Sequence, residues 1–119
     1  MSTRAEERER LALLQGTLDC LILKTLVLGP RHGAGVALAI EQGSHAALLV
    51  DHGSLYPALQ RLESRKWIRA KWGTSDNNRK ARFYELTPAG RRQLSREVSR
   101  WRALVAAIGA VLDPEGGKA

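Results

Sequence analysis

The alternation of apolar and polar residues predicts a series of short helices with one hairpin late in the chain. Apolar residues recur at three- and four-residue spacing over residues 18–28, with Thr17 as the predicted N-cap and Gly29-Pro30 as the stop. After a flexible loop at residues 31–35, a second apolar helix is expected over residues 36–42, with Gly43 as its terminator. The first of these segments is predicted to be a buried helix.

A third helix follows a segment of ambiguous structure. Residues 46–50 are small and apolar, and they fit either a short strand or a helical extension. Ser54 is then the predicted N-cap of a helix that runs to about Arg65. Pro57 fits this helix because we place it in the first turn, where backbone N–H groups have no intrahelical acceptor.

The last third of the chain predicts a hairpin and a long helix. Residues 67–72 and 81–86 alternate polar and apolar positions around a polar turn, which is typical of an antiparallel hairpin with one solvated face. Thr87 and Pro88 provide an N-cap and a first helical residue for a helix that continues to about Leu112. The element order predicts a mainly α (α+β) fold, a winged helix-turn-helix with a long C-terminal dimerisation helix.

The third predicted helix has an apolar face and a polar face. Its apolar face contains Leu55, Ala58, Leu59 and Leu62. Its free face carries Tyr56, Pro57, Gln60, Arg61, Glu63 and Ser64. A glutamine amide pairs with adenine, a guanidinium pairs with guanine or phosphate, and a phenol binds phosphate oxygens. We therefore assign Gln60 and Arg61 to base reading, and Ser54 and Tyr56 to phosphate contacts.

The predicted hairpin is strongly basic. A basic hairpin directly after the third helix favours DNA binding by the polar face of that helix over a face that is merely exposed to solvent. Six Lys or Arg residues lie between positions 66 and 82, with Asp76 as the only acid. The DNA contacts predicted here are Asn77, Asn78, Arg79, Lys80 and Arg82. The tip suits the minor groove, and the cations behind it suit phosphates. The alternative is that these charges only keep an exposed hairpin soluble.

Apolar residues in the last predicted helix repeat with the steps of a heptad. They are Leu94, Val98, Trp101, Val105, Ile108 and Leu112. The helix continues about three turns beyond what a small winged core covers, so we expect a second protomer to bury this seam. A homodimer would also read two DNA half-sites about one turn apart. The alternative is an intramolecular seam against the first segment of the chain.

Composition narrows the classes of function. The 119 residues carry a net charge of +7, which favours a polyanionic partner, and 44% of them are hydrophobic, as in globular proteins. Three histidines without a nucleophile signature or a phosphate-binding glycine loop predict no enzyme, no catalytic residue and no cofactor. The single Cys20 and the polar N-terminus indicate a cytoplasmic protein without a membrane partner.

Two histidines, one aspartate and the single cysteine are further candidate reactive side chains. His45, Asp51 and His52 raise the alternative of a metal sensor, but their spacing is not that of regular metal ligands, and we predict no metal. His52 is assigned instead to a phosphate contact beside the third helix. Cys20 falls on the predicted buried helix and is expected to be inert packing.

Three motifs resemble the PadR family of transcriptional regulators, over about residues 14–112. LQGTL at residues 14–18 followed by HGAG at 32–35 is similar to the family's opening. GSLYPAL at residues 53–59 is similar to its recognition-helix signature, and YELTPAG at 84–90 to the exit from its wing. Ala34 departs from the aromatic residue that the family commonly has between the two glycines.

The resemblance implies a dimeric winged-helix repressor. It places Ser54, Tyr56 and Pro57 at the DNA-facing start of the recognition helix. Several family members bind planar aromatic molecules in a cavity at the dimer interface, which makes Trp101 a candidate ligand residue for a small aromatic effector. Simple packing in the seam is the alternative role for this indole.

These inferences divide the chain into four parts. We expect an arm or short helix at residues 1–16, a winged helix-turn-helix DNA-binding domain at 17–86, a dimerisation helix at 87–113 and a disordered tail at 114–119. The predicted function is a sequence-specific transcriptional repressor that binds a pseudo-palindromic site in double-stranded DNA as a homodimer. The alternative is a winged-helix protein-interaction module that reads no sequence.

Overall fold

The computed structural model describes residues 17–114, and its elements follow the predicted order. Residues 17–25 are helical, and Thr17, the predicted N-cap, is already inside this helix. The other elements are β1 (Arg31–His32), α2 (Gly33–Gly43), α3 (His52–Ser64), β2 (Ile68–Thr74), β3 (Lys80–Leu86) and α4 (Pro88–Leu112). The α+β winged helix-turn-helix prediction is confirmed, whereas the predicted arm at residues 1–16 and nearly all of the predicted tail lie outside the described residues.

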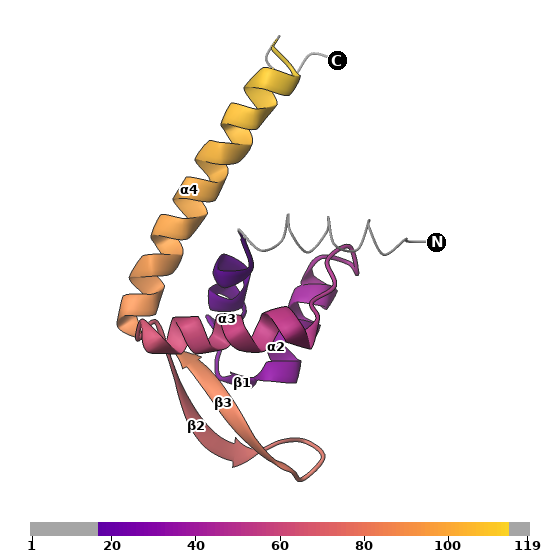
Figure 1. Ribbon diagram of the computed structural model, residues 1–119, viewed down its shortest axis with the longest axis vertical. Helices are drawn as coiled ribbons and strands as arrows, with labels where there is room; N and C mark the ends of the chain where they lie inside the picture. Colours follow the sequence, from indigo (N-terminus) through magenta and orange to yellow (C-terminus); the bar gives the residue numbers. More distant parts are fainter. Residues whose placement is uncertain (1–16, 115–119) are drawn as a thin grey trace.

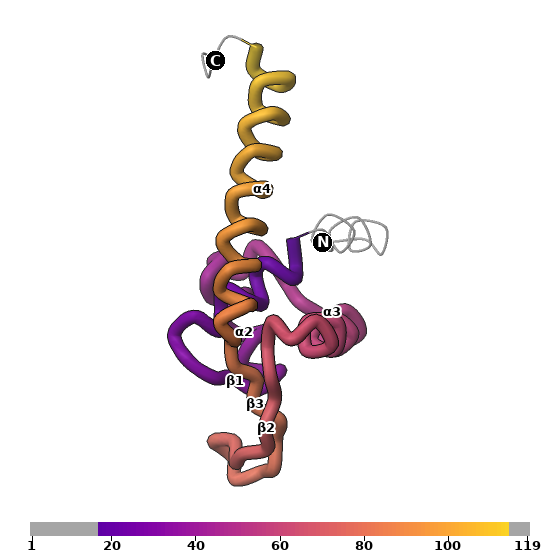
Figure 2. Tube along the Cα trace, turned by 90° about the vertical axis from the view of Figure 1, so that its left-hand side faces the viewer, coloured from indigo at the N-terminus to yellow at the C-terminus, as the bar shows by residue number. Residues whose placement is uncertain are grey.

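One apolar core holds the helices and the hairpin together. It takes Leu18, Ile22, Leu23 and Leu26 from the first helix, Val36, Ala37 and Ile40 from α2, Leu55, Ala58, Leu59 and Leu62 from α3, and Val50, Ile68 and Tyr84 from the remaining segments. Figure 1 shows the hairpin and α4 leaving the same side of this body, with α4 starting at the base of the hairpin and running in the opposite direction. The turned view in Figure 2 confirms that most of α4 extends away from the other elements.

The start of α2 differs from the prediction of a flexible loop at residues 31–35. Arg31 and His32 instead form β1, which pairs antiparallel with β3. The His32 side chain is the N-cap of α2, because its Nδ1 accepts a hydrogen bond of 2.9 Å from the Gly35 backbone N–H. Helix α2 therefore begins three residues earlier than predicted, and its first turn is attached to the sheet.

The end of α2 also differs from the prediction. Gly43 is the last helical residue, not the terminator, and the left-handed position that ends the helix is taken by His45, with φ of 53°. The backbone N–H groups of His45 and Ala46 bond to the carbonyls of Gln42 and Glu41, which is the pattern of a Schellman motif. Residues 46–50, which fitted a strand or a helical extension, form neither; they are turn, bend and irregular backbone.

The N-cap of α3 is Asp51, not Ser54. The Asp51 carboxylate accepts a hydrogen bond of 2.8 Å from the Ser54 backbone N–H, so the helix begins at His52. Pro57 is consequently the sixth helical residue rather than part of the first turn. It removes one backbone hydrogen bond in the second turn, which leaves the Gly53 carbonyl without its usual i+4 donor.

The three-stranded sheet has the order β1-β3-β2. Strands β2 and β3 pair in register from Ile68 with Leu86 to Thr74 with Lys80, as predicted for the hairpin. The Ser75 N–H donates to the Arg79 carbonyl at 2.8 Å, and Asn78 adopts a left-handed conformation with φ of 60°. This is a three-residue hairpin loop closed by an αL residue, a conformation that asparagine tolerates well.

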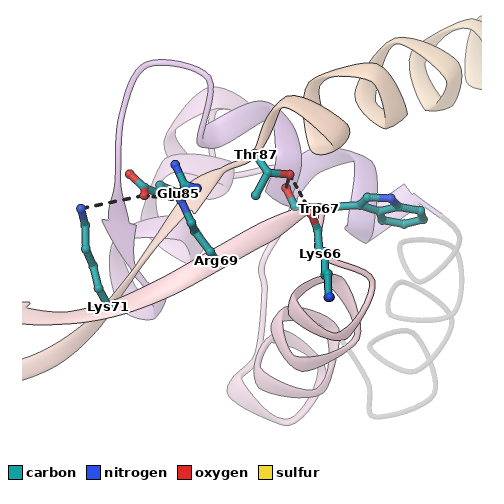
Figure 3. A network of polar contacts seen from close by, with 6 residues as sticks. All are labelled: Lys66, Trp67, Arg69, Lys71, Glu85 and Thr87. Carbon is teal, nitrogen blue, oxygen red and sulfur yellow. Dashed lines mark hydrogen bonds and ion pairs between the residues drawn. The ribbon is translucent and has the colours of Figure 1, made fainter.

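The junction between α3, β2 and α4 fixes the hairpin relative to both helices. Lys66 has φ of 63° and ends α3 in a second Schellman motif, in which the Trp67 N–H bonds to the Leu62 carbonyl at 3.1 Å. The Thr87 hydroxyl lies 2.7 Å from the Lys66 carbonyl and 3.0 Å from that of Trp67 (Figure 3). It also accepts a hydrogen bond of 3.0 Å from the Gly90 N–H, so Thr87 is the N-cap of α4, as predicted.

Gly90 lets α4 begin directly against the hairpin. A Cβ atom at this position would overlap the Trp67 backbone carbonyl and lie 2.8 Å from a methyl carbon of Leu86. Only glycine therefore allows this approach without moving the backbone of β2.

Candidate nucleic-acid interface

Helix α3 has the two faces that the sequence predicted. Leu55, Ala58, Leu59 and Leu62 are each at most 1% exposed. On the opposite side, Tyr56, Pro57, Gln60, Arg61 and Ser64 are exposed. The apolar side chains anchor the helix in the core, so the polar ones are held at fixed positions on the surface.

The outer face of α3 carries a shallow depression of about 430 Å³. It is lined by Pro57, Gln60, Arg61, Ser64 and Arg65. The structure thus brings together two residues predicted to read bases. It adds Arg65, whose guanidinium lies 5.1 Å from the centre of the Trp67 ring. Arg65 was not among the predicted DNA contacts because it stands at the end of the predicted helix; its spacing of four from Arg61 is the signal that points to it.

Arg61 is held by a partner from a distant part of the chain. Its guanidinium donates to the Asp19 carboxylate of the first helix at 2.8 Å. Both side chains are partly exposed, so the pair contributes little to stability, but it sets the direction of the Arg61 side chain. Of the two predicted base-reading side chains, that of Gln60 makes no hydrogen bond to any residue that the structure describes.

Acidic residues pair with about half of the hairpin's cations. Arg69 donates to Glu85 at 2.6 Å, and the Lys71 ammonium lies 3.9 Å from the same carboxylate (Figure 3). The Arg69 hydrogen bond, helped by the charge of Lys71, holds the pKa of Glu85 below its usual value. Arg82 similarly donates to Glu63 of α3 at 2.7 Å.

Two of the hairpin's three cations that have no acidic partner in the described part of the chain lie toward its tip. Arg79 and Lys80 are exposed and have no ion pair among residues 17–114. Asn77 is partly engaged, because its Oδ1 accepts the Ser75 hydroxyl at 2.8 Å, and Asn78 holds the left-handed position of the loop. The predicted tip residues therefore divide into two that shape the loop and two that present free charge.

A cleft of about 610 Å³ separates the hairpin from the starts of α2 and α3. It is lined by His32, Gly33, Ala34, Tyr56, Trp72, Ser75, Asn77, Arg79, Lys80, Ala81, Arg82 and Tyr84. Tyr56 reaches it because Gly33 has no side chain: a Cβ there would lie 2.8 Å from the Tyr56 ring. We call this space the wing cleft. Its lining includes four of the predicted DNA contacts from separate parts of the chain: Tyr56, Arg79, Lys80 and Arg82.

Asp51 and His52, two of the three candidate metal ligands, have other partners. Asp51 caps α3, and His52 is exposed with its ring 5.5 Å from that of Tyr56 in an edge-to-face contact. Among the described residues, no three His, Cys, Asp or Glu side chains are grouped closely enough to hold a metal ion. Cys20 is half-buried, and burial, with the nearby Glu97 carboxylate, raises the pKa of its thiol. A protonated thiol of this kind fits the prediction of inert packing.

Comparison with known proteins matches this arrangement to one family. Residues 22–96, more than half of the chain, match the transcriptional regulator PadR-like family. The chain belongs to the PadR-like family of transcriptional regulators. This confirms the resemblance drawn from the motifs, and it places the chain among DNA-binding regulators rather than enzymes.

This PadR-like regulator is similar to curated proteins and to solved structures. It is 28% identical over 89 residues to an uncharacterised protein X of Lysinibacillus sphaericus, a match that covers 75% of this chain and 82% of the relative. A PadR family regulator structure from Eggerthella lenta has a TM-score of 0.75 at 25% identity, with 90% of this chain and 91% of that chain covered. A transcriptional regulator structure from Clostridium thermocellum shares the fold, with a TM-score of 0.75 at 22% identity and coverage of 82% and 95%.

The last helix of this PadR-like regulator carries an apolar face that the described residues do not cover. Every residue from 99 to 112 is exposed, including Trp101, Leu104, Val105, Ile108, Val111 and Leu112. The earlier residues of the predicted seam differ, because Leu94 packs partly against the core and Val98 is half-buried. Leu104 and Val111 were missed by the heptad assignment, although each lies three residues after a seam residue. No helix among residues 17–114 combines the length and hydrophobicity that crossing a bilayer requires.

Proposed function

We propose that this PadR-like regulator is a homodimeric repressor that reads a pseudo-palindromic DNA site with the outer face of α3. The observation that carries the proposal is the fixed polar face of α3 beside a cationic hairpin. A helix of this kind fits the major groove, and the hairpin then lies along the adjacent phosphates.

Few side chains are proposed to contact the DNA bases. Gln60 is exposed and free to pair with a base, and Arg61 reads a second base or a phosphate after it releases Asp19. Ser54, Tyr56, Pro57 and His52 lie on the first turns of α3 and are proposed to set its position on the backbone. Because phosphate contacts carry little sequence information, specificity depends on very few side chains in each protomer.

The hairpin is proposed to supply most of the sequence-independent affinity. Arg79 and Lys80 offer charges without acidic partners among the described residues, and Arg82 adds a third cation from β3. Asn77 and Asn78 shape the tip that would approach the minor groove. Release of counterions from the phosphates should then make the affinity fall steeply with salt concentration.

The second protomer is proposed to pack on α4. An exposed stripe of large apolar side chains on an otherwise uncovered helix is stable only when another surface buries it. Trp101, Val105, Ile108 and Leu112 supply the centre of this seam, and Leu94 and Val98 lie where it meets the winged body. The protein would act in the cytoplasm, where it meets DNA.

Trp101 is also the proposed contact for a small aromatic effector. Its indole is 47% exposed and lies within the proposed dimer seam, where a planar ring could stack on it. Packing against the partner helix is the competing role, and a fluorescence titration of the dimer with small planar aromatic compounds separates the two.

A gel shift on the DNA upstream of the chain's own gene tests the proposal. The protein is expected to bind this DNA more tightly than a random duplex. Gln60→Ala should lower the affinity for the upstream DNA alone, by roughly tenfold for one lost base contact. Arg79→Ala should weaken binding to both duplexes and reduce the salt dependence. Equal affinity of the wild-type protein for the two duplexes, with both substitutions silent, would contradict the proposal.

A further inference from the structure

The wing cleft contains a buried polar side chain that the predicted DNA contacts do not use. Tyr84 of β3 lines the cleft, and only 6% of its surface is exposed. Its hydroxyl has no hydrogen-bond partner among the described residues. Every side-chain nitrogen or oxygen that is fully shielded from solvent in this part of the chain does have a hydrogen bond, so the Tyr84 hydroxyl is accessible to solvent. The hydroxyl therefore opens into the cleft. A phenol that is packed on its ring and free at its oxygen suits a ligand.

The other polar groups around Tyr84 are nearly all donors. Tyr56 brings a second phenol, and Arg79, Lys80 and Arg82 supply cations at the rim. Gly33 and Ala34 contribute the first turn of α2, where backbone N–H groups lack intrahelical acceptors. His32 accepts at Nδ1, so the remaining ring proton lies on Nε2, another donor. No Asp or Glu lines the cleft within the described part of the chain.

We propose that the wing cleft binds one phosphate group of the DNA backbone, with the hydroxyls of Tyr84 and Tyr56 as donors at its base and the hairpin cations at its rim. The proposal rests on the DNA-binding function proposed above and adds a defined phosphate-binding site to it, which we call the phosphate seat. A phosphodiester offers only acceptors and one negative charge, which complements a site built from donors and cations.

The protonation state of Tyr84 agrees with this role. Burial raises the pKa of Tyr84, and the neighbouring Glu63 and Tyr56 add to the rise, while Arg82 opposes it. The hydroxyl therefore keeps its proton at neutral pH and donates rather than repels. The Arg82 guanidinium, 5.9 Å from the centre of the Tyr84 ring, is held beside the phenol by its ion pair with Glu63.

The position of the cleft explains how one phosphate would orient the protein. Its walls come from β1, α2, α3 and both strands of the hairpin, so a phosphate bound there would lie among the elements proposed to face DNA. Such a contact fixes the angle between α3 and the groove but carries no sequence information. Loss of the seat should therefore weaken binding to all duplexes by the same factor.

Two substitutions test the seat without touching a cation. Tyr84→Phe removes one hydroxyl and keeps the buried ring, and Gly33→Ala places a methyl group 2.8 Å from the Tyr56 ring and displaces it. Gly43→Ala is the matched control, because it lies in the same helix and its added Cβ meets nothing within 4 Å. Fluorescence anisotropy of the full chain with the upstream DNA and with a random duplex gives the dissociation constants.

Tyr84→Phe and Gly33→Ala are each expected to weaken binding to both duplexes by about tenfold, the loss typical of a hydrogen bond to a charged group. Gly43→Ala should bind like the wild-type protein. Unchanged affinities for Tyr84→Phe would overturn the proposal, as would an equal loss in Gly43→Ala.

Inorganic phosphate distinguishes DNA from a free phosphate ligand. Trp72 lies in the cleft and is 66% exposed, so its fluorescence can report on occupancy. At constant ionic strength, a saturable response to inorganic phosphate that Tyr84→Phe abolishes, combined with unchanged DNA affinities, would assign the site to free phosphate and overturn the DNA assignment. If the wild-type protein shows no preference for the upstream DNA, the proposed sequence-specific function fails. The random duplex still decides whether the seat exists.

Discussion

The winged body and the far part of α4 are both built from well-formed helices, yet they bury very different amounts of apolar surface. In the body, Leu18, Ile22 and Leu59 are at most 2% exposed and share one core. Over residues 99–112 of α4, every side chain is exposed, and six of them are large and apolar. The body can therefore be stable as a single chain, whereas this part of α4 gains stability only from contacts with another surface.

The same contrast separates the two roles in the proposed function, which are DNA binding by the body and dimerisation by α4. Polar residues of the body are fixed by caps, ion pairs and a tight hairpin loop, which suits groups that must meet DNA in a defined geometry. The apolar residues of α4 carry no such polar anchors, which suits an interface between identical helices.

The largest effect is expected from truncating the core of the body. Leu59→Ala should lower the free energy of unfolding by about 2–5 kcal/mol at any protein concentration, because it creates a cavity among fully buried neighbours. Chemical denaturation measures this loss. Leu104→Ala, on the exposed face of α4, is the matched control and should cost much less at concentrations where the protein is monomeric. Equal losses would remove the distinction between the two regions.

A charge in the α4 seam should act on assembly rather than on the fold. Trp101→Arg is expected to raise the dimer dissociation constant by about tenfold or more, because an unpaired guanidinium would be buried at the interface. Sedimentation velocity measures the change. Ser99→Arg adds the same charge on the opposite side of the helix and should leave the dimer intact. A dimer that survives Trp101→Arg at low micromolar concentration would contradict the seam.

A smaller effect is expected where the body stores backbone strain. Lys66 adopts a left-handed conformation at the end of α3, and its side chain is exposed. Lys66→Gly should raise the free energy of unfolding by about 0.5–1 kcal/mol, because glycine adopts this conformation without a Cβ penalty. Thermal denaturation measures the gain, and a loss of stability would show that the lysine side chain matters more than its backbone.

The smallest effect is expected from replacing Glu85, the acid that pairs with Arg69 and Lys71. Because the folded state lowers the pKa of Glu85 from its ordinary value of 4.5, its ionised form stabilises the fold above that pH, and this contribution is lost as the pH falls through the lowered pKa. Glu85→Gln should flatten this part of the pH dependence of stability. An unchanged acid limb in the variant would show that the pair contributes nothing measurable.

Local sequence patterns predicted those parts of the fold that local forces determine. The N-cap of α4 follows from Thr87 and Pro88, and the hairpin follows from the alternation of apolar and polar residues around a polar turn. The buried face of α3 followed equally from spacing, because four leucine and alanine positions share one side of the helix. These features depend on residues within one or two turns of each other.

Features that depend on distant contacts or on unusual backbone were missed. His32 caps α2 only because the sheet holds β1 beside β3, and His45 ends α2 in a conformation that is more usual for glycine. Asp51 and Ser54 are both good N-cap residues, so the sequence alone chose the wrong one. The Arg61–Asp19 pair joins residues 42 positions apart, and Tyr84 was not singled out because its open hydroxyl depends on the cleft around it.

Footprinting on the upstream DNA tests most directly whether the exposed part of α4 takes part in reading DNA. We predict two protected segments centred about one helical turn, roughly 10 base pairs, apart in the wild-type protein. Ser99→Arg should reproduce this pattern, and Trp101→Arg should lose the paired protection at the same protein concentration. A single protected segment in the wild-type protein, or an unchanged pair in Trp101→Arg, would contradict the account.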